Sequence, residues 1–200
     1  MTTTTPTDWR VDVPEGTSGN VEVRKITVAD DYRNRMAGAR YCTPGEYTAL
    51  YRNGYLWMSD TSAEQLDHFE PVWQARTRGG SCLVMGLGLG MVVRQMLESP
   101  NVEHIDVVEL DRDVINLVGP TYAGPRCAIH HADAYSIRWP VGTRWAVAWH
   151  DIWADLCLDN LPQMATLARS YGRRVDWQGF WGKDLLVRER ARERRDPWNN

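Results

Sequence analysis

The stretch Cys82-Leu-Val-Met-Gly-Leu-Gly-Leu-Gly-Met91 decides the fold of this 200-residue chain. Its first four residues form a short, continuous apolar run, which is typical of a buried strand. Three alternating glycines follow directly, and such a cluster favours a tight turn. Met91–Glu98 then has a helical composition and ends before Pro100, which cannot continue a helix. The stretch therefore predicts a strand, a glycine-rich turn and a helix in succession.

The same alternation continues towards the C-terminus. Further strands are predicted at His104–Leu110, Arg126–His131 and Arg144–His150, and further helices at Asp111–Val118 and Asp159–Tyr171. A fifth strand can form at residues 173–179. Parallel strands need long return connections, and helices covering both faces supply them. We therefore predict an α/β fold with a Rossmann-like, doubly wound and mostly parallel sheet.

The rest of the chain divides by composition. Residues 1–20 are rich in Thr, Pro and Gly, which indicates a flexible N-terminal arm or an edge element. Residues 21–60 contain Asn53-Gly54 between apolar stretches, which predicts a small β-hairpin appendage. Residues 61–182 would form the Rossmann-like domain, and residues 183–200 a charged helix or solvated tail.

Composition also bounds the function. Hydrophobic residues make up 43% of the chain and no apolar run is long enough to cross a membrane, so we expect a globular protein without membrane contact. The four cysteines lack CxxC spacing and the N-terminus lacks a signal sequence, which favours the reducing cytoplasm. A net charge of −3 makes nucleic acid an unlikely partner. The ten tryptophans can supply an apolar wall for a small-molecule acceptor or the face of a homodimer.

The glycine turn predicts a ligand site. Gly86, Leu87, Gly88 and Gly90 lie where a strand meets a helix, and there a ligand can approach the backbone closely. About 20 residues later, Glu109 ends the next strand, where a carboxylate can accept both hydroxyl hydrogens of a ribose. We therefore expect a nucleoside-containing cofactor. Met91 stands where a dinucleotide-binding fingerprint needs its third glycine, so NAD is disfavoured.

The spacing G-x-G-x-G with a downstream Glu109-Leu110 resembles the class I S-adenosylmethionine-dependent methyltransferase superfamily. The resemblance extends to Asp133-Ala134 after the third predicted strand, and it implies that this carboxylate accepts from the adenine amino group. It also implies that Asp151, at the end of the fourth strand, reaches the methionine amine or the acceptor. S-adenosylmethionine is the cofactor that this resemblance implies.

Within that superfamily the chain is most similar to the spermidine synthase (polyamine aminopropyltransferase) branch. Asn53–Ser59 resembles the hairpin of that branch, and Val107–Ile115 is similar in sequence to its second strand. Three positions depart from the branch: Leu89 stands for an Asp, Trp57 for a Gln and Asp67 for a Tyr. These departures lie on the aminopropyl side, so we favour methyl transfer over aminopropyl transfer from decarboxylated S-adenosylmethionine. A non-catalytic, regulatory cofactor-binding protein is the third alternative.

Asp151 and Asp155 are the candidate catalytic residues. A carboxylate at the carboxyl end of a parallel strand lies where ligands bind, and it can orient or deprotonate an acceptor. His150 is a candidate helper. No metal site is expected, because the adjacent residues His130 and His131 would point to opposite faces of their strand.

Overall fold

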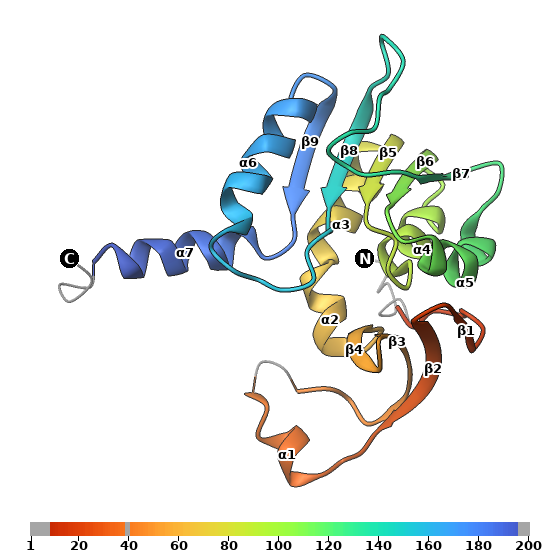
Figure 1. The fold of residues 1–200 in the computed structure, drawn as a ribbon, viewed down its shortest axis with the longest axis vertical. Coiled ribbons are helices and arrows are strands. Elements are labelled where there is room, and N and C mark those ends of the chain that lie inside the picture. The colour runs from red at the N-terminus through yellow and green to blue at the C-terminus, as the bar shows by residue number, and fades with distance from the viewer. Residues whose placement is uncertain (1–8, 39–40, 196–200) are drawn as a thin grey trace, which may run out of the picture.

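A computed structural model describes residues 9–38 and 41–195 of the protein and contains two separate β-sheets (Figure 1). The larger sheet has the order β7-β6-β5-β8-β9, and the smaller has the order β1-β2-β3-β4. The larger sheet comprises β5 (Gly80–Met85), β6 (Val102–Glu109), β7 (Cys127–His131), β8 (Trp145–His150) and β9 (Val175–Phe180). The smaller sheet comprises β1 (Gly16–Ser18), β2 (Val21–Val28), β3 (Gly45–Arg52) and β4 (Tyr55–Ser59).

The larger sheet confirms the predicted fold class. All of its neighbouring strands pair in parallel, including β9, the fifth strand. Met85 at the end of β5 is in register with Val108 on β6 and with His150 on β8. The chain thus runs outwards from β5 in one direction, to β6 and β7, and then in the other, to β8 and β9. The strand order reverses next to β5, as in other doubly wound sheets.

Helices cover both faces of this sheet. They are α3 (Phe69–Arg78), α4 (Met91–Leu97), α5 (Arg112–Tyr122) and α6 (Asn160–Tyr171), whereas α2 (Ser62–Asp67) precedes α3 and α7 (Lys183–Glu193) follows β9. The buried side chains of α3, α4 and α5 pack in one core cluster with Val84 and Val107 of the sheet. Those of α6 pack in a second cluster with Leu83 and Val108. Residues that alternate along the buried strands therefore serve opposite faces.

From Trp9 onward, the N-terminal residues provide the edge element that the sequence predicted as the alternative to a flexible arm. Trp9, Val11 and Val13 are buried, and Gly16–Ser18 forms the edge strand β1. The Asp60 carboxylate holds this segment, because its two oxygens accept the backbone N–H groups of Val11 and Thr48, each at 2.7 Å. Composition does not reveal this anchoring, since the partner lies far away in the sequence. Residues 1–8 of the predicted arm lie outside the described residues.

The predicted hairpin is the C-terminal half of the four-stranded antiparallel sheet. Asn53 and Gly54 both have positive φ, 51° and 78°, as a two-residue turn requires. The register shifts from Leu50–Met58 to Tyr51–Leu56, so Trp57 is the extra residue of a β-bulge. A short helix, α1 (Tyr32–Arg35), lies between β2 and β3.

The smaller sheet lies at the end of the larger one to which the parallel strands point (Figure 1). Ser18 of β1 donates a hydrogen bond of 2.8 Å to Asp113 on α5. Arg52 of β3 forms an ion pair of 2.7 Å with Asp111, the residue before α5. These contacts join the two sheets across the carboxyl edge of the larger one.

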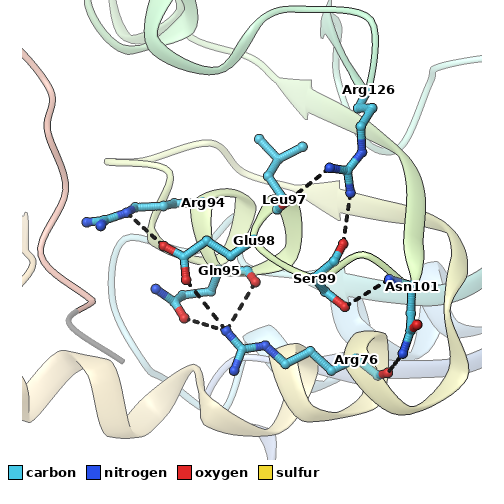
Figure 2. Close-up of polar contacts among 8 residues, drawn as sticks. All are labelled: Arg76, Arg94, Gln95, Leu97, Glu98, Ser99, Asn101 and Arg126. Carbon is cyan, nitrogen blue, oxygen red and sulfur yellow. Dashed lines mark hydrogen bonds and ion pairs between the residues drawn. The ribbon is translucent and has the colours of Figure 1, made fainter. Parts of the chain in front are cut away.

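A polar network holds the opposite end of the larger sheet (Figure 2). The guanidinium of Arg126 donates to the backbone carbonyls of Leu97, which ends α4, of Ser99 after it, and of Val102, the first residue of β6. Arg76 of α3 donates to the side chain of Gln95 at 2.8 Å. Cations at a helix C-terminus satisfy its unpaired carbonyls and complement its dipole.

Other predictions concern the ends of the chain and the membrane. Lys183–Glu193 of the predicted charged segment forms a helix, α7, which runs away from the body of the molecule (Figure 1). Residues 196–200 of that segment lie outside the described residues. Across the described residues, no helix has the length and apolar character needed to span a bilayer. All four cysteines are free, and Cys157 alone among them is exposed.

We expect Arg126→Met to lower the free energy of unfolding by about 1–2 kcal/mol, because three carbonyls lose a charged donor. Urea unfolding followed by circular dichroism measures this change. Arg169→Met is the matched control, since within the described part of the chain the Arg169 guanidinium donates to the nearby Thr166 hydroxyl and to no backbone carbonyl. Equal effects of the two substitutions would contradict the role assigned to Arg126.

Candidate functional site

A cavity of about 700 Å³ lies between the two sheets, within the size range of small-molecule sites. Its floor is the carboxyl end of the larger sheet, where β5, β6 and β8 end next to the reversal of strand order. Ligands of open α/β sheets bind at this position. Val21, Leu50 and Trp57 of the smaller sheet form the opposite wall.

The glycine turn forms part of the cavity wall, as predicted, but it is not a set of free amide donors. Gly86, Leu87 and Gly88 line the cavity, whereas Gly90 is buried outside it. Four of the five turn N–H groups already donate hydrogen bonds within the protein. Gly86 N–H donates to the Val108 carbonyl and Gly90 N–H to the Leu87 carbonyl. Leu87 N–H donates to a Glu109 carboxylate oxygen, and Leu89 N–H to the Met58 sulfur. The turn therefore contributes mainly shape to the cavity, and Gly88, which lines it, has the one turn N–H group not used by these four bonds.

Close packing explains why the turn needs its glycines. A Cβ at Gly86, whose φ is 93°, would lie 1.9 Å from the backbone oxygen of Asp151. A Cβ at Gly88 would lie 2.3 Å from the Met58 sulfur, and one at Gly90 would meet the Tyr122 ring at 2.1 Å. The first two contacts bring the end of β8 and strand β4 against the turn. The glycines thus draw the walls of the cavity together.

Glu109 lies at the place that the sequence predicts, in the cavity wall beside the turn. One carboxylate oxygen accepts the Leu87 N–H and the other accepts the Asp111 N–H, both at 2.8 Å. These bonds fix the orientation of the side chain between the turn and the start of α5. A carboxylate has about four lone-pair sites, so each oxygen can still accept a hydroxyl hydrogen.

Leu110, Asp133 and Ala134 also line the cavity, on the side of β6 and β7. One oxygen of Asp133 accepts the Tyr135 N–H at 2.9 Å, which orders the loop after β7. Leu110 is 68% exposed, whereas Ala134 is buried. Together with Glu109 they bring two carboxylates and an apolar surface to one end of the cavity.

Asp151 lies in the cavity directly after β8, and its side chain is 23% exposed. Burial first, and then the other carboxylates of the cavity, raise the pKa of Asp151 to about 7. His68 lies opposite, with its Nε2 atom 3.8 Å from Asp151 Oδ2. Burial lowers the pKa of His68 to about 4, so the imidazole is neutral near pH 7. Asp151 can therefore gain or release a proton near neutrality.

The sequence did not identify two further acids of the cavity. Glu64 and Asp67, both on α2, line it together with His68, the residue between α2 and α3. Both carboxylates help to raise the pKa of Asp151. Their separation by three residues on a helix could have indicated a shared face. Nothing in the sequence, however, places α2 opposite β8.

The structure does not bring Asp155 or His150 to the cavity. Asp155 is exposed, and its backbone carbonyl accepts from the Asn160 side chain at 2.7 Å. His150 is fully buried and stacked on Phe180, with ring centroids 4.4 Å apart. Burial lowers the pKa of His150 to about 4. His150 is the last residue of β8, and side chains alternate along a strand, so His150 points to the face opposite that of Trp149. Trp149 lines the cavity and His150 does not.

Tryptophans supply much of the remaining wall. Trp57, Trp149, Trp153 and Trp181 line the cavity. Regular alternation would send Trp57 and Met58 to opposite faces, but the bulge at Trp57 lets both reach the cavity. The Arg52 guanidinium lies over the Trp57 ring, 4.9 Å from its centroid. The cavity thus combines a carboxylate-rich region with an aromatic one.

Among the described residues, no group of three or more His, Cys, Asp or Glu side chains is arranged to hold a metal ion. His130 is instead paired with Asp106, at 2.8 Å. His131 contacts the Arg112 side chain at 2.8 Å and lines the cavity. The side chains of His130 and His131 therefore have different partners and do not share one site.

We expect Gly86→Ala to destabilise the protein by several kcal/mol, because its Cβ would collide with backbone that cannot move aside. Gly142→Ala is the matched control: its φ is 87°, and no atom lies within 4 Å of the added Cβ. It should cost only about 1 kcal/mol of backbone strain. Thermal unfolding of both variants compares the two effects, and equal losses would contradict the packing role of Gly86.

Asp151→Asn should stabilise the protein at about pH 8 and leave its stability unchanged towards pH 4. The folded protein holds the Asp151 proton more tightly than the unfolded chain does, so this carboxyl lowers stability as the pH rises from 3.8 to about 7. Asparagine removes that penalty. Urea unfolding across this pH range measures the difference, with Asp155→Asn, exposed in the same loop, as the control. A constant difference at every pH would refute the linkage.

No protein-family model matches the chain, and no curated protein matches it either. Among solved structures it is similar to N-methyltransferase NodS from Bradyrhizobium japonicum WM9, with TM-score 0.44 and 13% identity over 56% of this chain and 62% of that one. It is also similar to spermidine synthase from Thermotoga maritima, with TM-score 0.42 and 17% identity over 68% of this chain and 44% of that one. A third similar structure is the CcbJ methyltransferase from Streptomyces caelestis, with TM-score 0.43 and 16% identity over 55% of this chain and 45% of that one. The match spans less than two thirds of each of these proteins, and likeness at this level carries no information on activity.

Proposed function

We propose that the protein is an S-adenosylmethionine-dependent methyltransferase acting on a small-molecule acceptor. The observation that carries the proposal is the position of Glu109, oriented by two backbone N–H groups in the wall of a large cavity at the reversal of strand order. A carboxylate held in this way is suited to the two hydroxyl groups of a ribose. The sequence resemblance to this superfamily rests on the same residues.

The residues of the cavity fit an adenosyl group. Glu109 would hold the ribose, and Asp133 would accept from the adenine amino group next to the apolar surface of Leu110 and Ala134. Gly86, Leu87 and Gly88 would bound the space for the amino-acid part. The volume of about 700 Å³ leaves room for an acceptor beside the cofactor.

Asp151 is the proposed general base. When bound, S-adenosylmethionine supplies a methyl carbon that its positive sulfur makes open to displacement by a nucleophile. Asp151 would take the proton from the attacking heteroatom of the acceptor, while the tryptophans exclude water. Because the pKa of Asp151 is about 7, the carboxylate form increases as the pH rises through neutrality. Turnover should therefore rise with pH in that range.

Aminopropyl transfer to an amine is the second candidate, and the acids of the cavity favour it. Glu64, Asp67 and Asp151 concentrate negative charge at the acceptor side, which suits a cationic amine. Leu89, which replaces a carboxylate of the spermidine synthase branch, is fully buried in the core. With Leu89 at this position, the turn lacks the carboxylate of that branch, whereas Glu64 and Asp67 supply carboxylates from α2.

Calorimetric titration with S-adenosylmethionine, its decarboxylated form, S-adenosylhomocysteine and NAD tests the proposal. We expect binding of S-adenosylmethionine and S-adenosylhomocysteine, weakened at least about tenfold by Glu109→Gln because one oxygen is lost as an acceptor. Glu103→Gln, at an exposed position of the same strand, is the control and should bind normally. Circular dichroism checks that both variants fold.

Each result has a definite meaning. Preference for the decarboxylated form would favour aminopropyl transfer, and binding without consumption of any acceptor would favour a regulatory role. Binding of NAD alone, or equal binding by the Glu109→Gln variant and wild type, would refute the assignment of the cavity.

A further inference from the structure

A second, smaller cavity of about 200 Å³ lies next to the large one. It is formed where the segment between β7 and β8 packs against the C-terminal end of α6 and the residues that follow it. Ala134 and Tyr135 line both cavities, so the two share part of a wall. We call the smaller cavity the arginine pocket, because Arg138 and Arg174 line it.

The arginine pocket is positively charged, although the whole chain has a net charge of −3. Arg138 and Arg174 are two of its lining residues, and none of the lining residues is acidic. Burial raises the pKa of Tyr171, which also lines the pocket, whereas the Trp139 N–H and the charges of both arginines act against this rise. The two guanidinium groups therefore lie close enough to one hydroxyl to act on it together. Two positive charges beside one small cavity, with no carboxylate in its wall, favour a bound anion.

Hydrogen bonds to the backbone hold Arg174 in place. Its Nη1 atom donates to the carbonyls of Pro140 and Thr143, at 3.1 and 3.2 Å, and its backbone N–H donates to the Tyr171 carbonyl at 2.7 Å. Within the described part of the chain, Nε and Nη2 have no acceptor, and a guanidinium carries three N–H groups on these two atoms. Arg174 is thus oriented by the protein while most of its donors remain for a ligand.

The floor of the pocket is fixed by buried aromatic contacts. Trp139 Nε1 donates to the Tyr171 hydroxyl at 3.1 Å, and this hydroxyl donates to the Ala134 carbonyl at 3.5 Å. The Trp139 ring also packs edge-on against Trp145, with ring centroids 4.8 Å apart. These contacts fix the backbone beside Arg138. The Arg138 side chain itself is exposed, and among the described residues its guanidinium has no hydrogen bond or ion pair.

We propose that the arginine pocket is a second ligand site, which binds a phosphate dianion, either free or attached to a small organic molecule. Two guanidinium groups balance the two negative charges, and their planar N–H donors match the terminal oxygens of a phosphate. A carboxylate carries one charge and would leave one arginine without a partner. Sites for drug-sized ligands measure about 300–1,000 Å³, so a pocket of about 200 Å³ is suited to a smaller group. The proposal does not depend on the cofactor or the reaction of the large cavity.

Nuclear magnetic resonance of the full chain, with ¹⁵N-labelled tryptophan, tests the site. The Trp139 indole N–H reports on the pocket because it donates to Tyr171 there, and Trp139→Phe assigns its signal. Inorganic phosphate is titrated at constant ionic strength and about pH 8, where it is mainly dianionic. We expect a saturable shift of the Trp139 signal with a Kd of about 1–10 mM. A wild type without a saturable shift overturns the proposal.

Two arginine variants separate binding in the pocket from a general effect of charge. Arg138→Gln should weaken phosphate binding at least about tenfold, because charge-assisted hydrogen bonds are lost. Arg169→Gln is the matched control and should bind as wild type does, since Arg169 is exposed next to Ser170 but lies outside the pocket. Circular dichroism checks that both variants fold. Equal weakening in the two variants would overturn the site, because a diffuse positive field would then explain the binding.

Other anions identify the form of the ligand. Tighter binding of phenyl phosphate than of inorganic phosphate would support an organic phosphate that packs on the aromatic wall, and weaker binding would support free phosphate. Acetate that binds as tightly as inorganic phosphate would overturn the assignment, because the pocket would then not distinguish a dianion from a single carboxylate.

Discussion

The parallel pairing of β5 with β6 on one side and β8 on the other is the constraint from which the site follows. Both neighbours run in the same direction as β5, so their carboxyl ends meet at one edge of the sheet. The connections leave that edge towards opposite faces, and a crevice remains where they separate. The smaller sheet closes over this crevice and converts it into a cavity.

The glycine turn acts within this geometry as a close-packed corner. Gly86 allows the chain after β8 to approach the turn, and Gly88 allows Met58 of the smaller sheet to do so. Glu109 then ties the turn to the start of α5. The same residues that suggest a cofactor site therefore also hold three elements together.

The acids of the cavity come from distant parts of the chain and perturb one another. Asp151 follows β8, Glu109 ends β6, and Glu64 and Asp67 lie on α2. Desolvation by burial raises the pKa of Asp151, and repulsion from these other carboxylates adds to the shift. Such an arrangement is costly for stability, and costs of this kind are concentrated at functional sites.

The sequence alone determined the parallel strands, the glycine turn and the position of Glu109, because apolar runs, glycine clusters and strand-end acids are local patterns. It also placed Asp151 correctly at a strand end in the cavity wall. Only the tertiary structure decided that Glu64 and Asp67 share the cavity, that Asp155 and His150 do not, and that Trp9–Val13 are anchored by Asp60. These facts depend on how separate elements pack, and no local pattern of residues records a contact between segments that lie about 50 to 90 residues apart.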